Sequence, residues 1–556
     1  MKILGIHDGH TATASLFEDG KVLAAASEER FLRNKCWAGF PKKAITWMLE
    51  YTDTTPTDID MVVFPTTTIP LKQGQLDLKE AATPFRRMVS FSTSVLPSFV
   101  AGSNSLVGLY QKVRARSFES QKKELASLGI RAPIKTIDHH TSHAASALFS
   151  GIDHGLVFTL DGSGDGYSGS VWTYEEGHLT EKKRISAYHS LGEIYTRVTQ
   201  YLGMKPLEHE YKVMGLAPYA PKKIGEPAYE VFKEMFTVDG LNIKNTSGAW
   251  GLEFYKMLKN KLNGMRFDAI AYGLQKRFEE VVIKWVRNWM KEVGTKNIML
   301  GGGSFMNVKL NGKLSAMSDE FFVFPSCGDE SLPITASGLT YFQETGKIPE
   351  KLGPIYFGPQ HEFDGTTNHK GLSVEKISNP DKRAAELVAN NKIVARSSGR
   401  MEWGARALGN RSILANGASM NVVWKINRAI KKRDFWMPFA PSIQDSWIEK
   451  YFDTKRMSPY MILAFDSTDL AKEHIIAALQ QGDMSGRPQT VNSKWNEGYH
   501  KTLKWYEKLT GRGGFLNTSF NLHGDPIVNT PDDAIYTFVN SELDYLFIDD
   551  YMISRK

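Results

Sequence analysis

The order of apolar and polar residues predicts three short strands at the start of the chain. Apolar runs are separated there by the turn sequences Asp8-Gly9 and Asp19-Gly20. Turns of this composition between apolar runs are typical of β-hairpins. A helix is expected to begin after Pro41, and the following residues 70–130 have a looser, mostly helical pattern. The three predicted strands are residues 2–9, 11–17 and 22–27.

The same pattern occurs a second time after residue 150. "GLVFTLDG", "SGSVWTYEEG" and "HLTEKKRIS" predict three strands, with Asp161 and a run of glycines between the first two. Residues 296–314 then predict a strand, a glycine turn and the start of a helix. Glycines let backbone N–H groups approach phosphate oxygens, and carboxylates can hold a cation beside them. Two such units predict the actin-like ATPase architecture, with the two turns facing a nucleotide from opposite sides.

A change in composition divides the chain. Residues 346–365 are rich in Pro and Gly and lack periodic apolar positions, which is typical of a linker. After it we expect a helix over 380–390 and a strand over 392–399. The sequence therefore predicts two α/β domains, residues 1–355 and residues 372–556.

Composition narrows the class of protein only moderately. The chain has 556 residues, 42% of them apolar, and a formal net charge of +7, a mild excess that permits anionic ligands without indicating nucleic acid. The two cysteines, Cys36 and Cys327, are too few for a disulfide framework. No apolar run is long enough for a membrane span or a signal peptide, so we expect a cytoplasmic protein without a membrane partner.

A cluster of histidines is the first candidate for chemistry. His139 and His143 are four residues apart in "DHHTSHAASALFSG", on one face of a predicted helix that Gly151 would end. Such a pair can bind a divalent metal through two imidazoles. The alternative is a helix start capped by Asp138 with solvated histidines. We favour the metal because three histidines fall within five residues and the Asp161 turn follows.

The motifs, taken together, resemble a known family. "HDGHTATASL", "SEERFLRNK", "DHHTSHAASA", "LDGSGDG", "EYKVMGLAPY", "GGGSFMNVKLN" and "SCGDE" are followed by "GRMEWGARALGNRSI", "INRAIKKRDFWMPFAPSI" and "FLNTSFNLHGDPIV". In this order the blocks resemble those of the O-carbamoyltransferases of the nodulation-protein and antibiotic-tailoring type, over essentially the whole chain.

The resemblance implies a Kae1-type, actin-like N-terminal domain and a YrdC-like C-terminal domain. In relatives the C-terminal domain makes carbamoyl-adenylate from carbamoyl phosphate and ATP. The N-terminal domain transfers the carbamoyl group to a hydroxyl of a small-molecule acceptor beside a divalent metal, usually Fe(II). ATP and carbamoyl phosphate are then co-substrates, and Mg(II) and a homodimer are left open.

The same resemblance implies roles for individual residues. His10 resembles the histidine that deprotonates the acceptor, a task suited to imidazole; without the family it is a turn histidine. The implied metal ligands are His139, His143, Asp161 and Asp329. The implied ATP or adenylate contacts are Asp8, Lys35, Gly162, Ser163, Gly164, Glu210, Lys212, Gly302, Gly303 and Asn307. The implied carbamoyl phosphate contacts are Lys431, Lys432, Arg433, Arg487 and Ser519.

One departure from the family concerns the donor site. Many relatives have Arg-Pro-Phe-Ala-Pro where this chain has Met437-Pro-Phe-Ala-Pro, so a phosphate-binding arginine is absent there and Arg433 can stand in. Without the family, a solvated basic face accounts for the "KKR" sequence.

Two other functions were weighed. One is tRNA threonylcarbamoyl chemistry, which uses both domain types, but the chain has no basic arm or basic aromatic stripe for nucleic acid. The other is an ATP-switched binding module of the chaperone type, which needs the phosphate turns but neither the histidines nor the arginine-rich second domain. The sequence does not identify the acceptor. Residues 65–125 and 185–260 are expected to select it.

Overall fold

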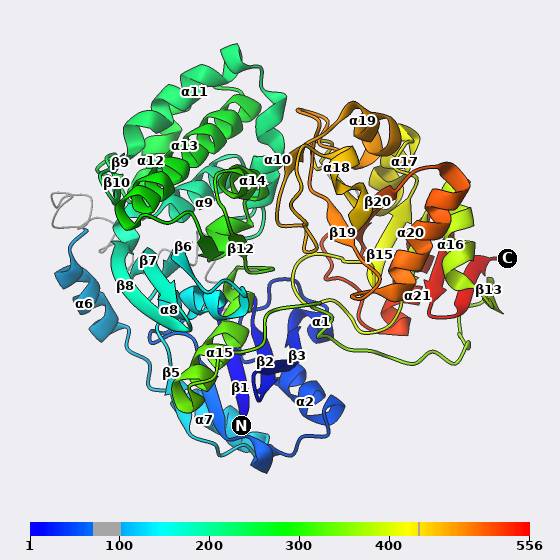
Figure 1. The fold of residues 1–556 in the computed structure, drawn as a ribbon, viewed down its shortest axis with the longest axis horizontal. Coiled ribbons are helices and arrows are strands. Elements are labelled where there is room, and N and C mark those ends of the chain that lie inside the picture. The colour runs from blue at the N-terminus through cyan, green and yellow to red at the C-terminus, as the bar shows by residue number, and fades with distance from the viewer. Residues whose placement is uncertain (71–101, 432–433) are drawn as a thin grey trace. The chain divides into compact units, whose positions relative to one another are not determined.

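The computed structural model describes residues 1–70, 102–431 and 434–556 (Figure 1). The chain divides into two compact units, the first formed by residues 1–28 and 36–352 and the second by residues 29–35 and 353–556. The predicted domains, residues 1–355 and 372–556, are parts expected to fold on their own, and their limits stay a prediction. None of the helices in the described ranges combines the length and apolar character required to cross a bilayer.

The first unit contains two sheets of the same design (Figure 1). The strands of the first are Lys2–His7 (β1), Thr13–Glu18 (β2), Lys21–Ser27 (β3), Met61–Phe64 (β4) and Ile134–Thr136 (β5). Those of the second are His154–Gly164 (β6), Tyr167–Glu175 (β7), His178–Ser186 (β8), Ile298–Gly301 (β11) and Phe321–Val323 (β12). Within the described residues the orders are β3-β2-β1-β4-β5 and β12-β11-β6-β7-β8.

The pairing confirms the duplication. β1 pairs antiparallel with β2 and parallel with β4, and β6 pairs antiparallel with β7 and parallel with β11. A hairpin followed by a parallel crossover in both halves is the layout predicted from the repeated sequence pattern. The expected fold class, a duplicated actin-like unit followed by an α/β unit, is confirmed.

Helix Leu332–Thr345 (α15) connects the first sheet to the functional side chains. It packs against β1, β2 and β4 and against helix His139–Ala144 (α8). A Cβ at Gly5 would lie 2.2 Å from the carbonyl oxygen of Pro333, so only glycine allows β1 to come this close to α15. Because Asp329 lies just before α15, this packing fixes it near the end of β1.

The other elements of the first unit surround these sheets. As predicted, a helix follows Pro41, and the described part of residues 70–130 contains two helices. Helices α11 and α13 pack along each other. The helices are Glu29–Leu32 (α1, in the second unit), Lys42–Tyr51 (α2), Asn104–Val113 (α6), Glu119–Ser127 (α7), Leu191–Tyr201 (α9), Glu210–Leu216 (α10), Lys222–Met235 (α11), Gly251–Lys261 (α12), Phe267–Val293 (α13) and Val308–Ala316 (α14), and Phe236–Asp239 (β9) and Asn242–Asn245 (β10) form a small hairpin.

Two local expectations need correction. The turn between β6 and β7 lies at Asp165-Gly166, both with positive φ, whereas Asp161 to Gly164 belong to β6 in a stretch where the pairing with β7 is irregular. The α-helix that starts at His139 ends at Ala144 and continues as a 3-10 helix to Phe149, rather than running to Gly151.

The second unit is a mixed α/β structure, and its described part contains one sheet of eight strands with order β13-β22-β21-β14-β15-β20-β16-β19. These are Leu372–Lys376 (β13), Val394–Ser397 (β14), Arg411–Ala415 (β15), Ala440–Gln444 (β16), Gln489–Val491 (β19), Gly514–Ser519 (β20), Tyr545–Ile548 (β21) and Tyr551–Arg555 (β22). A short pair, Phe465–Asp466 (β17) and Ser485–Gly486 (β18), lies outside this sheet. The helices are Pro380–Ala389 (α16), Met420–Ile426 (α17), Ile448–Tyr451 (α18), Asp469–Ile475 (α19), Glu497–Thr510 (α20) and Pro531–Val539 (α21).

Two predicted elements of this unit are confirmed: the helix expected over 380–390 is α16, and the strand expected over 392–399 is β14. Two clusters of buried apolar residues form its core, one of which contains Ala385, Leu414 and Phe515 from α16, β15 and β20. The short segment 29–35 groups with this unit, because the Arg33 guanidinium donates to the carbonyls of Ile527 and Pro526.

Candidate metal centre and catalytic site

Helix α8 presents two buried imidazoles side by side. Asp138 caps the helix by accepting the N–H of Thr141 at 3.0 Å, and the Arg184 guanidinium holds this carboxylate at 2.9 Å. Residues four apart lie on one face of a helix, so His139 and His143 point the same way. Both are buried, which excludes the solvated helix start considered as the alternative.

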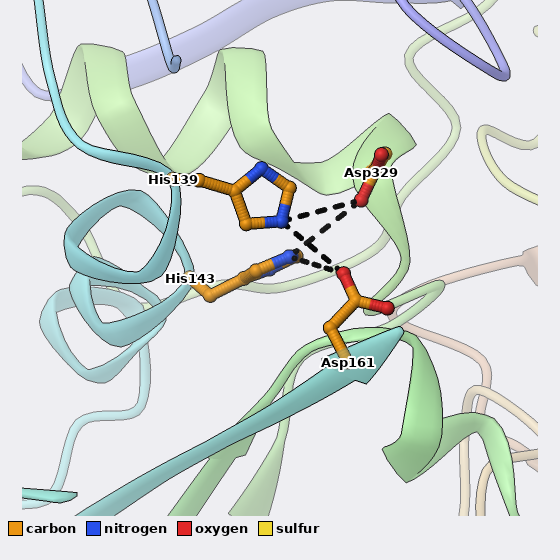
Figure 2. A group of neighbouring side chains, drawn as sticks. All are labelled: His139, His143, Asp161 and Asp329. Carbon is orange, nitrogen blue, oxygen red and sulfur yellow. Dashed lines mark hydrogen bonds and ion pairs between the residues drawn. The ribbon is translucent and has the colours of Figure 1, made fainter. Parts of the chain in front are cut away.

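Two carboxylates complete the group (Figure 2). Asp161, on β6, lies with Oδ2 3.2 Å from Nε2 of His139 and 3.4 Å from Nε2 of His143. Asp329, in the 3-10 turn before α15, lies with Oδ1 3.7 Å from the same two nitrogens. Figure 2 shows all four side chains pointing toward one another, and their ligand atoms lie within 4.8 Å of one another.

Charge and burial fit this group to a cation. Burial lowers the pKa of His139, but the charge of Asp329 and the hydrogen bond to Asp161 outweigh it and raise that pKa to about 9. Burial raises the pKa of Asp161, yet its hydrogen bonds with the two histidines hold it well below the usual range. Among the described residues, Nδ1 of the buried His143 has no hydrogen-bond partner. Two imidazoles and two carboxylates suit a divalent first-row metal.

A third carboxylate, Asp165, anchors the start of α8. It accepts the backbone N–H of His139 at 3.0 Å, and its other partners are the Oγ1–H groups of Thr66 and Thr68 and the N–H groups of Thr67 and Thr68. Its role is not evident from the sequence, because the three threonines that bind it lie 97 to 99 residues before it. Asp165 therefore connects α8, the helix that carries His139 and His143 and is called the metal helix below, to the loop after β4.

The glycines near Asp161 have different roles. A Cβ at Gly164 would lie 2.1 Å from the His139 ring, and one at Gly303 would lie 3.0 Å from Oδ1 of Asp161, so these two glycines make room for the candidate ligands. A Cβ at Gly162 would meet nothing within 4 Å, and Ser163 is exposed. Gly302 has a φ of +99°, which requires glycine. The Gly162 N–H donates to Oδ1 of Asp161 at 2.7 Å, and the Gly162 carbonyl accepts from the Ser190 hydroxyl at 2.6 Å, so Gly162 belongs to the framework around Asp161.

His10 is held in one tautomer. Its Nε2 lies 3.1 Å from the carbonyl oxygen of Leu207, which can only accept, so Nε2 carries the proton. Its Nδ1 is buried and has no hydrogen-bond partner among the residues that the structure describes. The structure thus leaves a basic nitrogen with a free lone pair, as a general base requires.

His7 joins His10 to the metal group and is not among the residues predicted from the sequence. Its Nε2 lies 3.0 Å from the His10 carbonyl oxygen and 3.5 Å from Oδ2 of Asp329. Burial lowers its pKa, so it is neutral near pH 7. The signal in the sequence was "HDGH", with two histidines around one Asp-Gly pair.

Several residues predicted to contact the nucleotide are bound to other protein groups. Glu210 accepts the N–H of Leu207 at 2.7 Å and the hydroxyl of Thr196 at 3.0 Å, and burial raises its pKa. Lys212 is buried on the same helix, α10.

Asn307 caps α14 by accepting the N–H of Leu310 and pairs with Gln275. Lys35 belongs to the segment that groups with the second unit, and Asp8 pairs with Arg116.

Comparisons with known proteins decide the family. The family model described as Carbamoyltransferase N-terminus matches residues 2–337, and the one described as Carbamoyltransferase C-terminus matches residues 385–555. The chain belongs to the carbamoyltransferase family. This carbamoyltransferase is 31% identical to nodulation protein NolNO of Sinorhizobium fredii, over 99% of the chain and 79% of the relative. It is 31% identical to nodulation protein NolO of Bradyrhizobium diazoefficiens, over 76% and 79%.

Among solved structures, the carbamoyltransferase is similar to full-length HypF in a phosphate- and nucleotide-bound form. The TM-score is 0.35 and the identity 12%, with 62% of this chain and 47% of HypF covered. The family match covers both units, so the resemblance seen in the sequence is confirmed and the protein is a carbamoyl-transferring enzyme.

The donor residues predicted in the second unit of the carbamoyltransferase are only partly described. Ser519 ends β20 and donates its hydroxyl to Oδ1 of Asn521 at 2.7 Å, and Arg487 follows β18. Lys431 ends the helical turn Asn427–Lys431. Lys432 and Arg433 lie outside the described residues. Their roles stay predictions.

One arginine in the glycine-rich segment 399–412 of the carbamoyltransferase is structural. The Arg411 guanidinium is buried and donates to the carbonyls of Ser398, Gly399 and Asn410, and burial lowers its pKa to about 10. Glu402 organises the same segment by accepting the N–H groups of Leu408, Asn410 and Arg411. Arg411 therefore binds the protein backbone rather than a phosphate.

Proposed function

We propose that this enzyme is an ATP-dependent O-carbamoyltransferase that works in two steps. In the first step, carbamoyl phosphate, ATP and one water give carbamoyl-adenylate, pyrophosphate and phosphate. In the second step, a hydroxyl oxygen of a small-molecule acceptor attacks the carbamoyl carbon. The bond from that carbon to the AMP oxygen breaks, and AMP leaves. Family membership supports the carbamoyl group, and the site in the first unit supports the second step.

The observation that carries the proposal is the free lone pair of His10. Nδ1 of His10 is buried and has no partner in the described part of the chain, while Nε2 donates to the Leu207 carbonyl. The same residue's carbonyl accepts from His7, which contacts Asp329 of the metal group. His10 Nδ1 takes the proton of the attacking hydroxyl, as a general base does.

The four candidate ligands suit a divalent metal, for which we propose Fe(II), with Mg(II) as the alternative. When bound, the metal supplies a Lewis acid that polarises the carbamoyl oxygen and lowers the barrier to attack. His139, His143, Asp161 and Asp329 hold it. Asp165 keeps the metal helix in register through the N–H of His139.

The nucleotide is proposed to bind at the glycine-lined edge of the same site. The phosphate is proposed to lie against the exposed Ser163, next to Asp161. In the second unit, Arg487 and Ser519 are proposed to contact carbamoyl phosphate together with Lys431, Lys432 and Arg433. Guanidinium groups are well suited to a phosphate-bearing donor.

The test combines two measurements on the purified full chain. Pyrophosphate release from ATP should require carbamoyl phosphate, and mass spectrometry should detect acceptors that gain one carbamoyl group. His10→Gln should keep pyrophosphate release and lose acceptor carbamoylation by about 100-fold, a usual contribution of a general base. His154→Gln, at an exposed histidine, is the matched control and should leave both unchanged. Pyrophosphate release without carbamoyl phosphate would contradict the proposal.

A further inference from the structure

A short stretch near the start of the chain, residues 29–35, is built into the second unit and is called the inserted segment below. The residues on either side of it belong to the first unit. There the N–H of Glu28 donates to the Ala12 carbonyl at 2.9 Å, and the Ala12 N–H donates to the Trp37 carbonyl at 2.8 Å. Ala12 comes two residues after His10. Both ends of the inserted segment are therefore fixed to a residue close in sequence to the proposed base.

Arg33 is the first anchor of the inserted segment. Its Nη1 donates to the Ile527 carbonyl at 2.7 Å, and its Nη2 donates to the Pro526 carbonyl at 3.0 Å. Its Nε lies 3.4 Å from Oδ1 of Asp533. Arg33 has a φ of +54°, an unfavourable conformation that persists only where surrounding contacts hold it. All three guanidinium nitrogens thus engage one stretch of the second unit, residues 526–533.

The stretch that Arg33 holds is joined to the predicted donor contact Ser519. The Ser519 hydroxyl donates to Oδ1 of Asn521 at 2.7 Å, and Nδ2 of Asn521 donates to the Asp525 carbonyl at 2.8 Å. Asp525 directly precedes Pro526, whose carbonyl accepts from Arg33. Loss of the Arg33 contact would therefore be transmitted to Ser519 through the loop between them.

Arg30 holds a second loop next to the predicted donor contacts. Its side chain is buried, and Nη2 donates to the Gly404 carbonyl at 2.9 Å. Gly404 lies in the glycine-rich segment described above, in which the Leu408 carbonyl accepts from Nε2 of Gln489 at 2.7 Å. Gln489 comes two residues after Arg487, which is proposed to bind carbamoyl phosphate. The inserted segment thus holds one loop beside each of the two donor contacts.

The placement of these loops matters for a small anionic donor. Carbamoyl phosphate offers few atoms for a protein to bind, so its affinity depends on how accurately the contacting groups are placed. Both guanidinium groups of the inserted segment donate to backbone carbonyls. They therefore act on the path of the loops, and through the loops on the groups that meet the donor.

We propose that Arg30 and Arg33 are positioning residues for the carbamoyl phosphate site, which the inserted segment completes. The inference rests on the proposed function, since it concerns donor binding in the second unit. Residues 353–556 alone are then an incomplete donor site. Donor binding depends on a stretch of chain whose two ends are hydrogen-bonded to Ala12 in the first unit.

The test uses the full chain and compares variants at Arg33. Arg33→Met should raise the KM for carbamoyl phosphate in pyrophosphate release, and the Kd in calorimetric titration with carbamoyl phosphate, about tenfold, because both carbonyl contacts are lost. The kcat at saturating donor and the transfer from supplied carbamoyl-adenylate should be unchanged. Arg33→Lys should restore part of the affinity, since an ammonium can still donate to a carbonyl but lacks the planar fork.

Arg131→Met, at an exposed arginine, is the control and should match the wild type. An unchanged KM and Kd in Arg33→Met, or an equal loss of transfer from the adenylate, would overturn the inference. Arg33→Lys decides by the same readouts if Arg33→Met does not fold. A wild type that binds carbamoyl phosphate but releases no pyrophosphate would contradict the proposed function, and the Kd of the variants then judges the inference on its own. A wild type that does not bind carbamoyl phosphate would overturn both.

Discussion

At the scale of single residues, the base in this site depends on a backbone carbonyl. The Leu207 carbonyl accepts from His10, and the Leu207 N–H donates to Glu210. The Glu210 carboxylate therefore positions Leu207, and Leu207 positions His10. Leu207 has a φ of +61°, an unfavourable conformation for a residue with a side chain. The hydrogen bonds of Glu210 with Leu207 and Thr196 stabilise that conformation. Glu210 is thus a positioning residue for His10.

Removing this support should slow the second step only. We expect Glu210→Ala to lower kcat for acceptor carbamoylation about threefold to tenfold, because the N–H of Leu207 loses the hydrogen bond that positions it. Glu210→Gln should restore most of it, because the amide oxygen still accepts both hydrogen bonds. Pyrophosphate release should be unchanged in both variants. Equal loss in the Gln and Ala variants would show that the charge of Glu210 acts in another way.

The metal assignment also belongs to the residue scale. His143→Ala removes one of four ligands and should abolish stoichiometric metal, measured by elemental analysis of protein loaded with Fe(II) under anaerobic conditions. Acceptor carbamoylation should be lost while pyrophosphate release persists, since donor activation is assigned to the other unit. His154→Ala is the control. If His143→Ala kept both its metal and its transfer activity, the metal site would be wrong.

Whether a site residue could be predicted from the sequence depends on how far its contacts lie from it along the chain. The four ligand positions could be predicted because the family motifs mark them, and the structure brings them together. Asp165 lies in the block "LDGSGDG", but nothing in that block separates its role from that of Asp161, and Arg116 lies in none of the blocks; their partners are His139 and Asp8, which are distant in the sequence. Residues whose role depends on such long-range contacts cannot be identified from spacing alone.

At the scale of elements, strand patterns were predicted well and turns less well. The apolar runs defined β1, β2, β6 and β7 because most residues of these strands are buried, whereas β8 is mostly exposed and was indicated by its position after the turn. The turn before β7 was placed at Asp161, although it lies at Asp165-Gly166. Both stretches contain Asp and Gly, and the sequence does not show which Asp must face the histidines of α8.

The hairpin of β9 and β10 provides an element-scale prediction. Nδ1 of His189 accepts the N–H of Asn245 at 3.1 Å, and burial, with a smaller effect from Lys244, lowers the pKa of His189 to about 4. The folded state therefore resists protonation that the unfolded segment accepts near pH 6.5. Stability is complete above pH 6.5 and is lost as the pH falls toward 4, by roughly 1 to 2 kcal/mol at pH 5.

The measurement is hydrogen exchange of residues 236–249 at pH 7 and pH 5, corrected for intrinsic exchange rates. Protection should fall at pH 5 in the wild type. His189→Gln, which can still accept the N–H of Asn245, should show little change between the two pH values, and His154→Gln should behave like the wild type. The same fall in the His189→Gln variant would assign the pH dependence to another group.

At the scale of the whole molecule, the order of elements followed from the sequence more completely than the division of the chain. The two five-stranded sheets and the later α/β unit were predicted from repeated hairpin patterns and the Pro/Gly-rich stretch at 346–365. The grouping of residues 29–35 with the second unit was not predicted, because it depends on contacts of Arg30 and Arg33 with residues beyond 400. Such contacts leave no periodic signal.

The central claim is a division of labour, with donor activation in the second unit and transfer in the first. It is tested most directly by supplying carbamoyl-adenylate to two full-length variants and following carbamoylation of an acceptor by mass spectrometry. Arg487→Ala should fail with limiting carbamoyl phosphate and ATP, because it loses a charge-assisted contact worth roughly 1.5 to 3 kcal/mol, but should transfer normally from the adenylate. His10→Gln should release pyrophosphate and fail with either source. An Arg487→Ala variant that the adenylate does not rescue, or a His10→Gln variant that it does, would contradict the account.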